Sequence, residues 1–360
     1  MNIKDFISGE WTQCYQYKSF SPSPVNHEWS WEDPQINHLL EKATQAIGEL
    51  NAYSLIVPDV DLFIQMHVIK EASTSSRIEG TRTGIDEALS PKEMVSPELR
   101  DDWQEVQNYV KAMNSAIEDL DTIPLSNRLL KETHKILLQD VRGSEKQLGE
   151  FRNSQNWIGG SGPSNAVFVP PHFSEVNDLM SDLEKFWHND ELLVPHLVKI
   201  AISHYQFETI HPFLDGNGRI GRLLITLYFV SKNLLNKPTL YVSSYLEKNR
   251  NDYYDALMRV REKNDLGYWI RCFLTAVLKT AQEGKETFQS IQQLRNEVEK
   301  STLSLGRRAE KARSLLNYLY KNPLVTAPEV SSLFNVTHQT ASALIRDFEE
   351  LSILQKWKNA

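Results

Sequence analysis

Apolar residues at three- and four-residue spacing dominate the chain from Gln35 onward, and they constrain its fold more than any other feature. Such spacing gathers apolar side chains on one face of an α-helix. Leu39, Ala43, Ile47 and Leu50 form the first such set. We expect further helices at 60–79, 96–113, 127–138, 174–187, 195–210, 219–234 and 251–260, the last pattern continuing to about 300. The predicted fold class is therefore all-α.

Residues 149–172 interrupt the helical pattern with Gly, Asn and Pro and with two short β-prone runs. The runs at 157–158 and 167–169 flank a turn of Gly, Ser and Pro, so they predict a small β-hairpin. Residues 18–34 are rich in Ser and Pro, and they predict an irregular segment ahead of the first helix.

Composition and charge exclude several classes of function. The 360-residue chain has a formal net charge of −8, unlike a general binder of nucleic acid or anionic membranes. Its cysteines, Cys14 and Cys272, form no CxxC pair, which argues against a zinc, iron–sulfur or disulfide framework. We see no secretory signal, and no uncharged apolar run reaches the ~20 residues of a membrane span. We therefore expect a cytoplasmic protein without membrane association.

The segment 211–222, HPFLDGNGRIGR, combines backbone features that suit a phosphate group. Pro212 ends the helix that delivers His211. The Asp-Gly-Asn-Gly run at 215–218 can adopt φ > 0 and turn its backbone N–H groups inward as an anion nest. A helix starts directly afterwards at Arg219, and its N-terminus adds positive partial charge at the same place.

Four side chains of this segment supply a base, a metal ligand and two cations. His211 is its only group able to act as a base near neutral pH. Asp215 is a hard oxygen ligand of the kind that holds Mg²⁺ beside a polyphosphate. Arg219 and Arg222 are three residues apart, so both project from one side of the first helical turn and match phosphate oxygens. Transfer at a phosphorus centre needs such a set.

The segment resembles the signature of the Fic family, HPFx[DE]GNGRxxR, at every defined position. The resemblance implies a helical core in which the histidine deprotonates a target hydroxyl, which then attacks the α-phosphate of ATP and expels pyrophosphate. It gives His211 the role of the base and Asp215 that of the Mg²⁺ ligand. The ATP-binding positions that it implies are Gly216, Asn217, Gly218, Arg219, Ile220, Gly221 and Arg222. Related protein kinases carry a lysine in the GNG stretch, so Gly218 favours adenylylation.

Two other stretches share this resemblance. Residues 149–152, 157–160 and 166–171 are similar to the family's hairpin flap, which takes up target backbone as an added strand. Residues 243–255 match the family pattern after the loop, where Tyr254 would pack against or hydrogen-bond the adenosine. The residues alone leave two alternatives open, a surface hairpin without a role and a core or helix-surface tyrosine.

An inhibitory motif is suggested upstream, at Ser75-Ser-Arg-Ile-Glu79-Gly80. The dipole disfavours a carboxylate at the C-terminal end of a helix, so Glu79 there is least costly with a cationic partner. The stretch resembles the motif [ST]xxxE[GN] of one Fic class. That resemblance implies that Glu79 pairs with Arg222, blocks the γ-phosphate position and leaves ATP bound unproductively. The alternative is a solvated glutamate at a helix end, and in some relatives the same glutamate positions water for removal of AMP.

Residues 301–312 are small and polar, and they predict a hinge before a separate C-terminal module. Thr326 and Glu329 have capping-box form for a helix at 327–334, and Thr337 can cap a second helix. This helix-turn-helix pattern is similar to the winged-helix domain appended to Fic proteins, but we expect no room for a two-stranded wing at 355–360.

The charge of the C-terminal module leaves its role open. Residues 307–360 carry eight Lys or Arg and five Asp or Glu, a net charge of +3. Phosphate contacts along DNA need more cations than this, which makes DNA binding doubtful. A protein-interaction role, including a homodimer, is the alternative.

Three domains and one leading function are expected. The domains are an N-terminal helical region with the inhibitory helix at 1–100, a Fic catalytic core at 101–300 and a helix-turn-helix domain at 301–360. The leading hypothesis is a protein adenylyltransferase that moves AMP from ATP to a Ser, Thr or Tyr hydroxyl of a target protein, itself included, under inhibition by Glu79. The alternatives are a DNA-binding regulator with a nucleotide-sensing Fic core, and a Fic transferase with another nucleotide donor.

Overall fold

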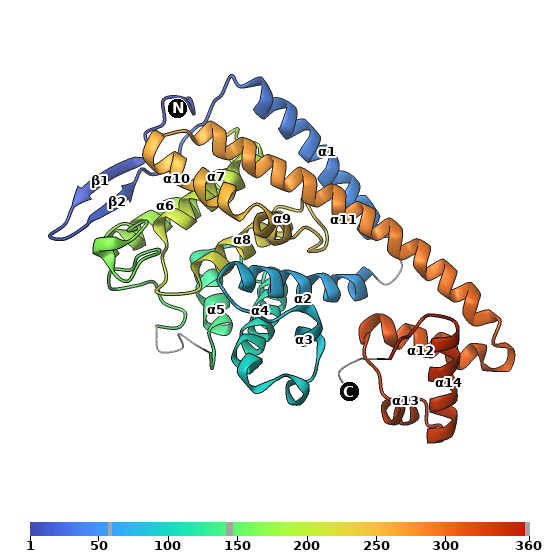
Figure 1. Ribbon diagram of the computed structural model, residues 1–360. Coiled ribbons are helices and arrows are strands. Elements are labelled where there is room, and N and C mark those ends of the chain that lie inside the picture. Colours follow the sequence, from blue (N-terminus) through green and yellow to red (C-terminus); the bar gives the residue numbers. More distant parts are fainter. Residues whose placement is uncertain (57–59, 142–146, 357–360) are drawn as a thin grey trace. The chain divides into compact units, whose positions relative to one another are not determined.

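A computed structural model describes residues 1–56, 60–141 and 147–356, and its regular elements are helices apart from two short strands (Figure 1). The all-α fold class is therefore confirmed. The main helices are α1 (Pro34–Ile56), α2 (Val60–Ile78), α3 (Ile85–Leu89), α4 (Arg100–Asp119), α5 (Asn127–Leu137), α6 (Val176–His188), α7 (His196–Ile210), α8 (Asn217–Ser231), α9 (Ser243–Lys248), α10 (Arg250–Lys263), α11 (Leu266–Leu303), α12 (Ala309–Lys321), α13 (Ala327–Leu333) and α14 (His338–Glu350). Among the helices of those ranges, none has both the length and the apolar character that crossing a bilayer requires.

The chain forms two compact units. The first comprises Met1–Ser54 and His67–Gly284, and the second comprises Leu55–Met66 and Lys285–Ala360. The domain boundaries expected near residues 100 and 300 stay predictions.

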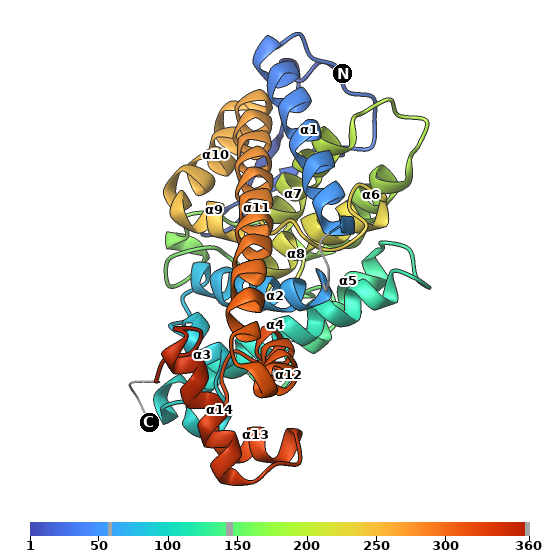
Figure 2. The same cartoon turned by 90° about the vertical axis from the view of Figure 1, so that its right-hand side faces the viewer.

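The first unit is built around α7 and α8, which run through its interior. Every residue of α7 from Leu197 to Ile210 is buried, so this helix is covered on all sides rather than on one face. The neighbours of α8 are α4, α5 and α7, and α6 packs against α7. On the outside, α1 lies beside the first part of α11 in both views (Figure 2), where Gly284 lets Leu50 approach the helix backbone closely. The loop between α7 and α8 is thus held by buried helices on both ends.

The strands β1 (Gly9–Gln13) and β2 (Lys18–Pro22) form an antiparallel hairpin in which Trp11 pairs with Phe20. The prediction of an irregular segment at 18–34 is therefore wrong for its first five residues, which form β2. Phe20 is fully buried, and its ring lies 5.0 Å from that of Trp11. Tertiary packing of this one aromatic side chain outweighs the Ser- and Pro-rich composition around it.

The hairpin predicted near residues 157–169 is reduced to one antiparallel bridge, between Ile158 and Phe168. Gly159 and Gly160 both have positive φ, at 69° and 70°, so the chain turns away immediately after Ile158. On the other side, the N–H of Phe20 donates to the carbonyl of Val169 at 2.9 Å. This segment therefore pairs with β2 as well as with itself, which the sequence did not indicate.

The start of α4 also differs from the prediction. Pro97–Leu99 form a single 3₁₀ turn, and the Ser96 side chain makes no capping hydrogen bond to it. The α-helix begins at Arg100. A 3₁₀ turn ahead of an α-helix is common. A serine followed by proline, as at 96–97, can precede either a 3₁₀ turn or an α-helix, so the sequence does not distinguish them.

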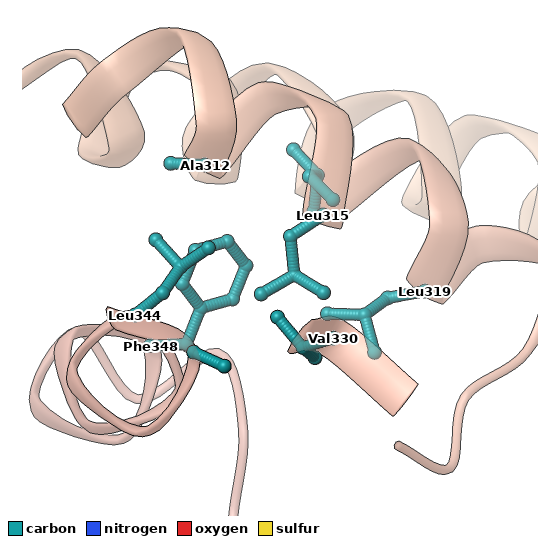
Figure 3. Close-up of a cluster of buried hydrophobic side chains, with 8 residues drawn as sticks. Ala312, Leu315, Leu319, Val330, Leu344 and Phe348 are labelled. Atoms are coloured by element: carbon teal, nitrogen blue, oxygen red, sulfur yellow. The ribbon is translucent and has the colours of Figure 1, made fainter. Parts of the chain in front are cut away.

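The second unit has a small core of its own, shown in Figure 3. The core residues are contributed by α12, α13 and α14; they are Ala312, Leu315, Leu316, Leu319, Val330, Ala341, Leu344 and Phe348. The capping box of Thr326 with Glu329 and the cap from Thr337 are confirmed. A role of the helix-turn-helix in binding stays a prediction. The segment 355–360, for which no two-stranded wing was expected, lies in part outside the described residues, since these end at 356.

Two leucines of this unit provide a matched test of its core. Leu344 is 3% exposed and Leu333 is 48% exposed. We expect Leu344→Ala to lower the free energy of unfolding by about 2–5 kcal/mol, because it leaves a cavity. Leu333→Ala should cost about 1 kcal/mol or less. Urea unfolding followed by circular dichroism measures both, and equal losses would contradict the packing of Figure 3.

Candidate active site

His211 follows the last residue of α7 in a left-handed backbone conformation, with φ 50° and ψ 61°. Its N–H donates to the carbonyl of Phe207 at 2.9 Å and closes the helix. Residues other than glycine rarely adopt this conformation, so surrounding contacts have to hold it.

Arg152 and Asn156 provide those contacts. The Nε of Arg152 donates to the carbonyl of His211 at 3.0 Å, and Nη2 donates to the carbonyls of Pro171 and Ile210 at 2.5 and 3.3 Å. Asn156 Nδ2 donates to the carbonyl of His211 at 3.0 Å. Burial lowers the pKa of Arg152 to about 10, so it remains a cation at neutral pH. The sequence analysis missed this role, although Arg152 ends the stretch 149–152 that resembles the family's flap.

The loop between α7 and α8 turns at one glycine. Gly216 has φ 73°, whereas Asp215, Asn217 and Gly218 do not have positive φ. The predicted run of four such residues is therefore wrong. The amide of Asn217 closes the loop instead, since Oδ1 accepts from the N–H of Phe213 and Nδ2 donates to the carbonyl of Phe213, both at 2.8 Å. Because α8 begins at Asn217, the loop still lies at a helix N-terminus.

His134 of α5 contacts the loop between α7 and α8, and the sequence analysis missed this residue as well. Its Nδ1 accepts from the N–H of Gly149 at 3.0 Å, so the proton of the neutral ring lies on Nε2. That nitrogen is 3.1 Å from the carbonyl of Asp215, to which it donates. The ring stacks on Phe213, with 3.9 Å between centroids. Burial lowers the pKa of His134 to about 4, which keeps the ring neutral. No local pattern around His134 signals this.

Arg222 is 1% exposed and is held by the end of α2. Its Nε donates to Ser75 Oγ at 2.8 Å, and Nη2 donates to the carbonyl of Ser75 at 2.9 Å and to Glu79 Oε1 at 2.7 Å. The ion pair between Glu79 and Arg222 that the resemblance implied is present. Ser75 is the first residue of the quoted motif, which is the signal that could have identified it.

The carboxylate of Glu79 lies close to Gly218 and is partly exposed to solvent. Its side chain is 36% exposed. Desolvation acts to raise the pKa of Glu79, but the charge and hydrogen bond of Arg222 outweigh it, so the pKa is lowered. A Cβ atom on Gly218 would come within 2.1 Å of Glu79 Oε1. The absence of a side chain at 218 is therefore necessary for this position of Glu79.

Arg219 was expected to bind phosphate oxygens of ATP, and it is paired with a carboxylate from α4. Its Nη1 lies 3.1 Å from Glu105 Oε2, with both side chains less than a tenth exposed, and its Nη2 lies 3.9 Å from Asp215 Oδ1. Sequence reasoning missed Glu105, since a partner 114 residues away leaves no local signal.

His211 is neutral at physiological pH. Burial lowers its pKa to about 4, the charge of Glu79 acts in the opposite direction, and Arg261 and Arg152 lower it further. A neutral imidazole can accept a proton, as a general base must.

Comparisons with known proteins agree with this geometry. The Fic/DOC family N-terminal model matches residues 37–118, and the Fic/DOC family model matches residues 124–229. Together the two ranges span more than half of the chain. The chain belongs to the Fic/DOC family.

Named relatives and solved structures of the Fic family extend the match. A protein adenylyltransferase Fic from Aedes aegypti is 27% identical over 275 residues, which are 71% of this chain and 51% of that protein. One from Culex quinquefasciatus is 30% identical over 203 residues, 54% of this chain and 37% of that protein. A Fic family protein from Desulfovibrio desulfuricans shares the fold at a TM-score of 0.59 and 20% identity, over 89% of this chain and 90% of its own. The chain thus spans about half or less of the length of the two proteins from Aedes aegypti and Culex quinquefasciatus.

Three other predicted ATP-binding residues, two at the start of α8 and one on α10, differ in their surroundings. Ile220 is buried, and Gly221 lies against the carboxyl of Glu208. Tyr254 is half-buried, and the guanidinium of Arg250 lies 5.7 Å from the centre of its ring. Their roles in ATP binding stay predictions.

Asp215 is the carboxylate of the Fic loop that could hold a metal ion. Within the described ranges, no three His, Cys, Asp or Glu side chains converge as a metal-binding group. Mg²⁺ does not need such a group, because it is held by one or two carboxylates together with phosphates and water. Asp215 is 36% exposed and lies just before α8, a setting that fits this mode of binding.

The buried His204 behind the Fic loop gives a test by pH. Its ring contacts the carbonyl of Gly221 at 2.9 Å and the hydroxyl of Tyr253 at 3.0 Å, and burial lowers its pKa from 6.5 to about 3. Below pH 6.5 the unfolded chain therefore binds a proton at this histidine that the folded chain does not bind. The free energy of unfolding therefore decreases as the pH is lowered. Between about pH 7 and pH 5 this single group should cost about 2 kcal/mol.

The measurement is urea unfolding of wild type and His204→Gln at the two pH values. The loss on acidification should be smaller in the variant by about that 2 kcal/mol, because the other buried histidines contribute equally to both proteins. Identical losses would contradict the neutral, buried state of His204.

Proposed function

We propose that this protein is a protein adenylyltransferase, which moves AMP from ATP to a Ser, Thr or Tyr hydroxyl of a target protein. The observation that carries the proposal is the neutral His211 held beside the N-terminus of α8, in a loop with the full Fic signature. The names of the relatives from Aedes aegypti and Culex quinquefasciatus support it.

The chemistry follows from the residues of the loop. His211 takes the proton of the target hydroxyl, and the hydroxyl oxygen forms a bond to the α-phosphorus of ATP. The bond from that phosphorus to the bridging oxygen breaks, and pyrophosphate leaves. The N-terminus of α8 stabilises negative charge on the phosphates. Asp215 would hold Mg²⁺, which when bound offsets phosphate charge.

We propose further that Glu79 keeps this site inactive. Three contacts tie Arg222 to Ser75 and Glu79, so its guanidinium is unavailable to the outer phosphates of ATP while α2 is in place. The carboxylate also adds negative charge where a γ-phosphate would lie. Loss of Glu79 removes this negative charge and one of the three contacts, and it leaves Ser75 to orient Arg222.

The proposal is tested with Glu79→Gly protein incubated with ATP and Mg²⁺ and examined by intact-protein mass spectrometry. We expect self-modification by AMP to rise about 5- to 150-fold over wild type, the range of a typical coupling energy between sites. Adding His211→Ala to that variant should reduce transfer by about 10²–10⁴-fold.

Two results would contradict the proposal. Equal modification with and without His211 would exclude it as the base, and equal modification with and without Glu79 would exclude the inhibition. Parallel incubations with GTP, UTP and CTP identify the donor, and a preference for one of these would replace ATP in the proposal.

A further inference from the structure

A second buried acid, Glu208, lies one helical turn before His211 on α7. Its Oε2 is 4.0 Å from Nδ1 of His211, and the two side chains are 8% and 19% exposed. His211 directly follows α7, and its left-handed backbone brings its ring to this distance from the carboxyl of Glu208.

Two polar atoms of this pair lack hydrogen-bond partners. In the described part of the chain, neither Nδ1 of His211 nor Oε1 of Glu208 meets the distance and angle of a hydrogen bond, although the backbone of Glu208 lies near enough to the ring to act on the pKa of His211, which it raises. Buried polar groups are nearly always hydrogen-bonded, so two such atoms side by side call for an explanation. Because Nδ1 is buried while the ring is 19% exposed, the ring reaches solvent along another edge.

The backbone of α8 leaves space for the carboxyl of Glu208. A Cβ atom on Gly221 would lie 2.2 Å from Glu208 Oε1 and 3.2 Å from its Cδ. Glycine in a helix interior costs about 1 kcal/mol relative to alanine. The glycine at 221 thus accommodates the acid at a cost in helix stability.

The charges around Glu208 come from three elements. Burial raises its pKa to about 7; Arg222 of α8 and Arg261 of α10 lower it, and Glu79 after α2 raises it. Arg261 also donates to the backbone carbonyl of Glu208 at 3.0 Å. When Glu79 is absent, the two arginines therefore favour the carboxylate form of Glu208.

We propose that Glu208 is a positioning residue for His211: in the reacting state its carboxylate accepts a hydrogen bond from Nδ1–H, which leaves Nε2 to take the target proton. The inference rests on the proposed adenylyltransferase function. Hydrogen bonds of catalytic histidines are often long before substrate binds and shorten in the complex. We therefore expect the 4.0 Å between Nδ1 of His211 and Oε2 of Glu208 to shorten to a hydrogen bond when substrate binds. After proton transfer His211 is a cation, and the Glu208 carboxylate stabilises it without taking the proton.

The test uses Glu208→Gln in the Glu79→Gly protein, which retains the size of the side chain and removes its charge. We expect kcat for AMP transfer to fall on the order of 10²-fold with the KM for ATP unchanged, because the residue acts on the base rather than on the nucleotide. The parent should lose activity as pH falls through the pKa of Glu208, between 4.5 and about 7. That acid limb should be missing in the glutamine variant.

Gly221→Ala in the same background is the second variant, and it keeps the acid but displaces it. The new methyl group would lie 2.2 Å from Oε1 of Glu208, so the carboxyl has to leave its present position beside His211. We expect a similar fall in kcat. Nitrogen-15 NMR of the His211 ring gives a readout without ATP: Nδ1 should carry the proton in Glu79→Gly, and this preference should weaken in both variants.

The outcomes separate the two proposals. If Glu79→Gly protein transfers no AMP, the proposed function fails and this inference fails with it. If it transfers AMP and Glu208→Gln has the same kcat and the same acid limb, Glu208 is not a positioning residue, and the function stands. A fall in kcat accompanied by an unchanged acid limb and an unchanged ring tautomer would also overturn the inference, since it would reflect packing alone.

Discussion

A guanidinium cannot stay buried without partners, and Arg222 satisfies this requirement through the end of α2. Its side chain is 1% exposed, and Ser75 and Glu79 together accept three of its hydrogen bonds. These contacts tie the end of α2 to α8, and because the Glu79 side chain is 36% exposed, solvent screens its share of the ion pair. The position of α2 at the site therefore follows from the need to compensate one cation.

The catalytic loop depends on a second buried cation. Arg152 donates to the carbonyls of Ile210 and His211 and to that of Pro171, and Asn156 donates a second hydrogen bond to the carbonyl of His211. These hydrogen bonds offset the cost of a left-handed residue at the end of α7. The position of the histidine is thus set by residues about 55–59 places earlier in the chain.

Periodicity and the loop signature made the helices and the core of the site predictable. Most of the long helices in the first 260 residues appear within about six residues of their expected bounds, but the break between α10 and α11 and the helix α12 at 309–321, part of which was predicted to be a hinge, were missed. His211 and Asp215 follow from the loop motif, and the contact of Glu79 with Arg222 follows from the family resemblance. Residues that act over long sequence distances were not predictable: Glu105, His134 and Asn156 carry no pattern of their own. The β1–β2 hairpin was missed for a related reason, because its stability comes from Phe20 in a distant core.

Gly218 links two properties of the chain through one missing atom. Its lack of a Cβ leaves the phosphate side of the loop open, and it also leaves room for Glu79 Oε1, which would lie only 2.1 Å from a Cβ atom at this position. Any side chain at this position displaces the glutamate as it changes the nucleotide site. Under the inhibition by Glu79 that we propose, a lineage that changed the reaction through a side chain at position 218 would lose this inhibition in the same step, so a new reaction and constitutive activity would be inherited together.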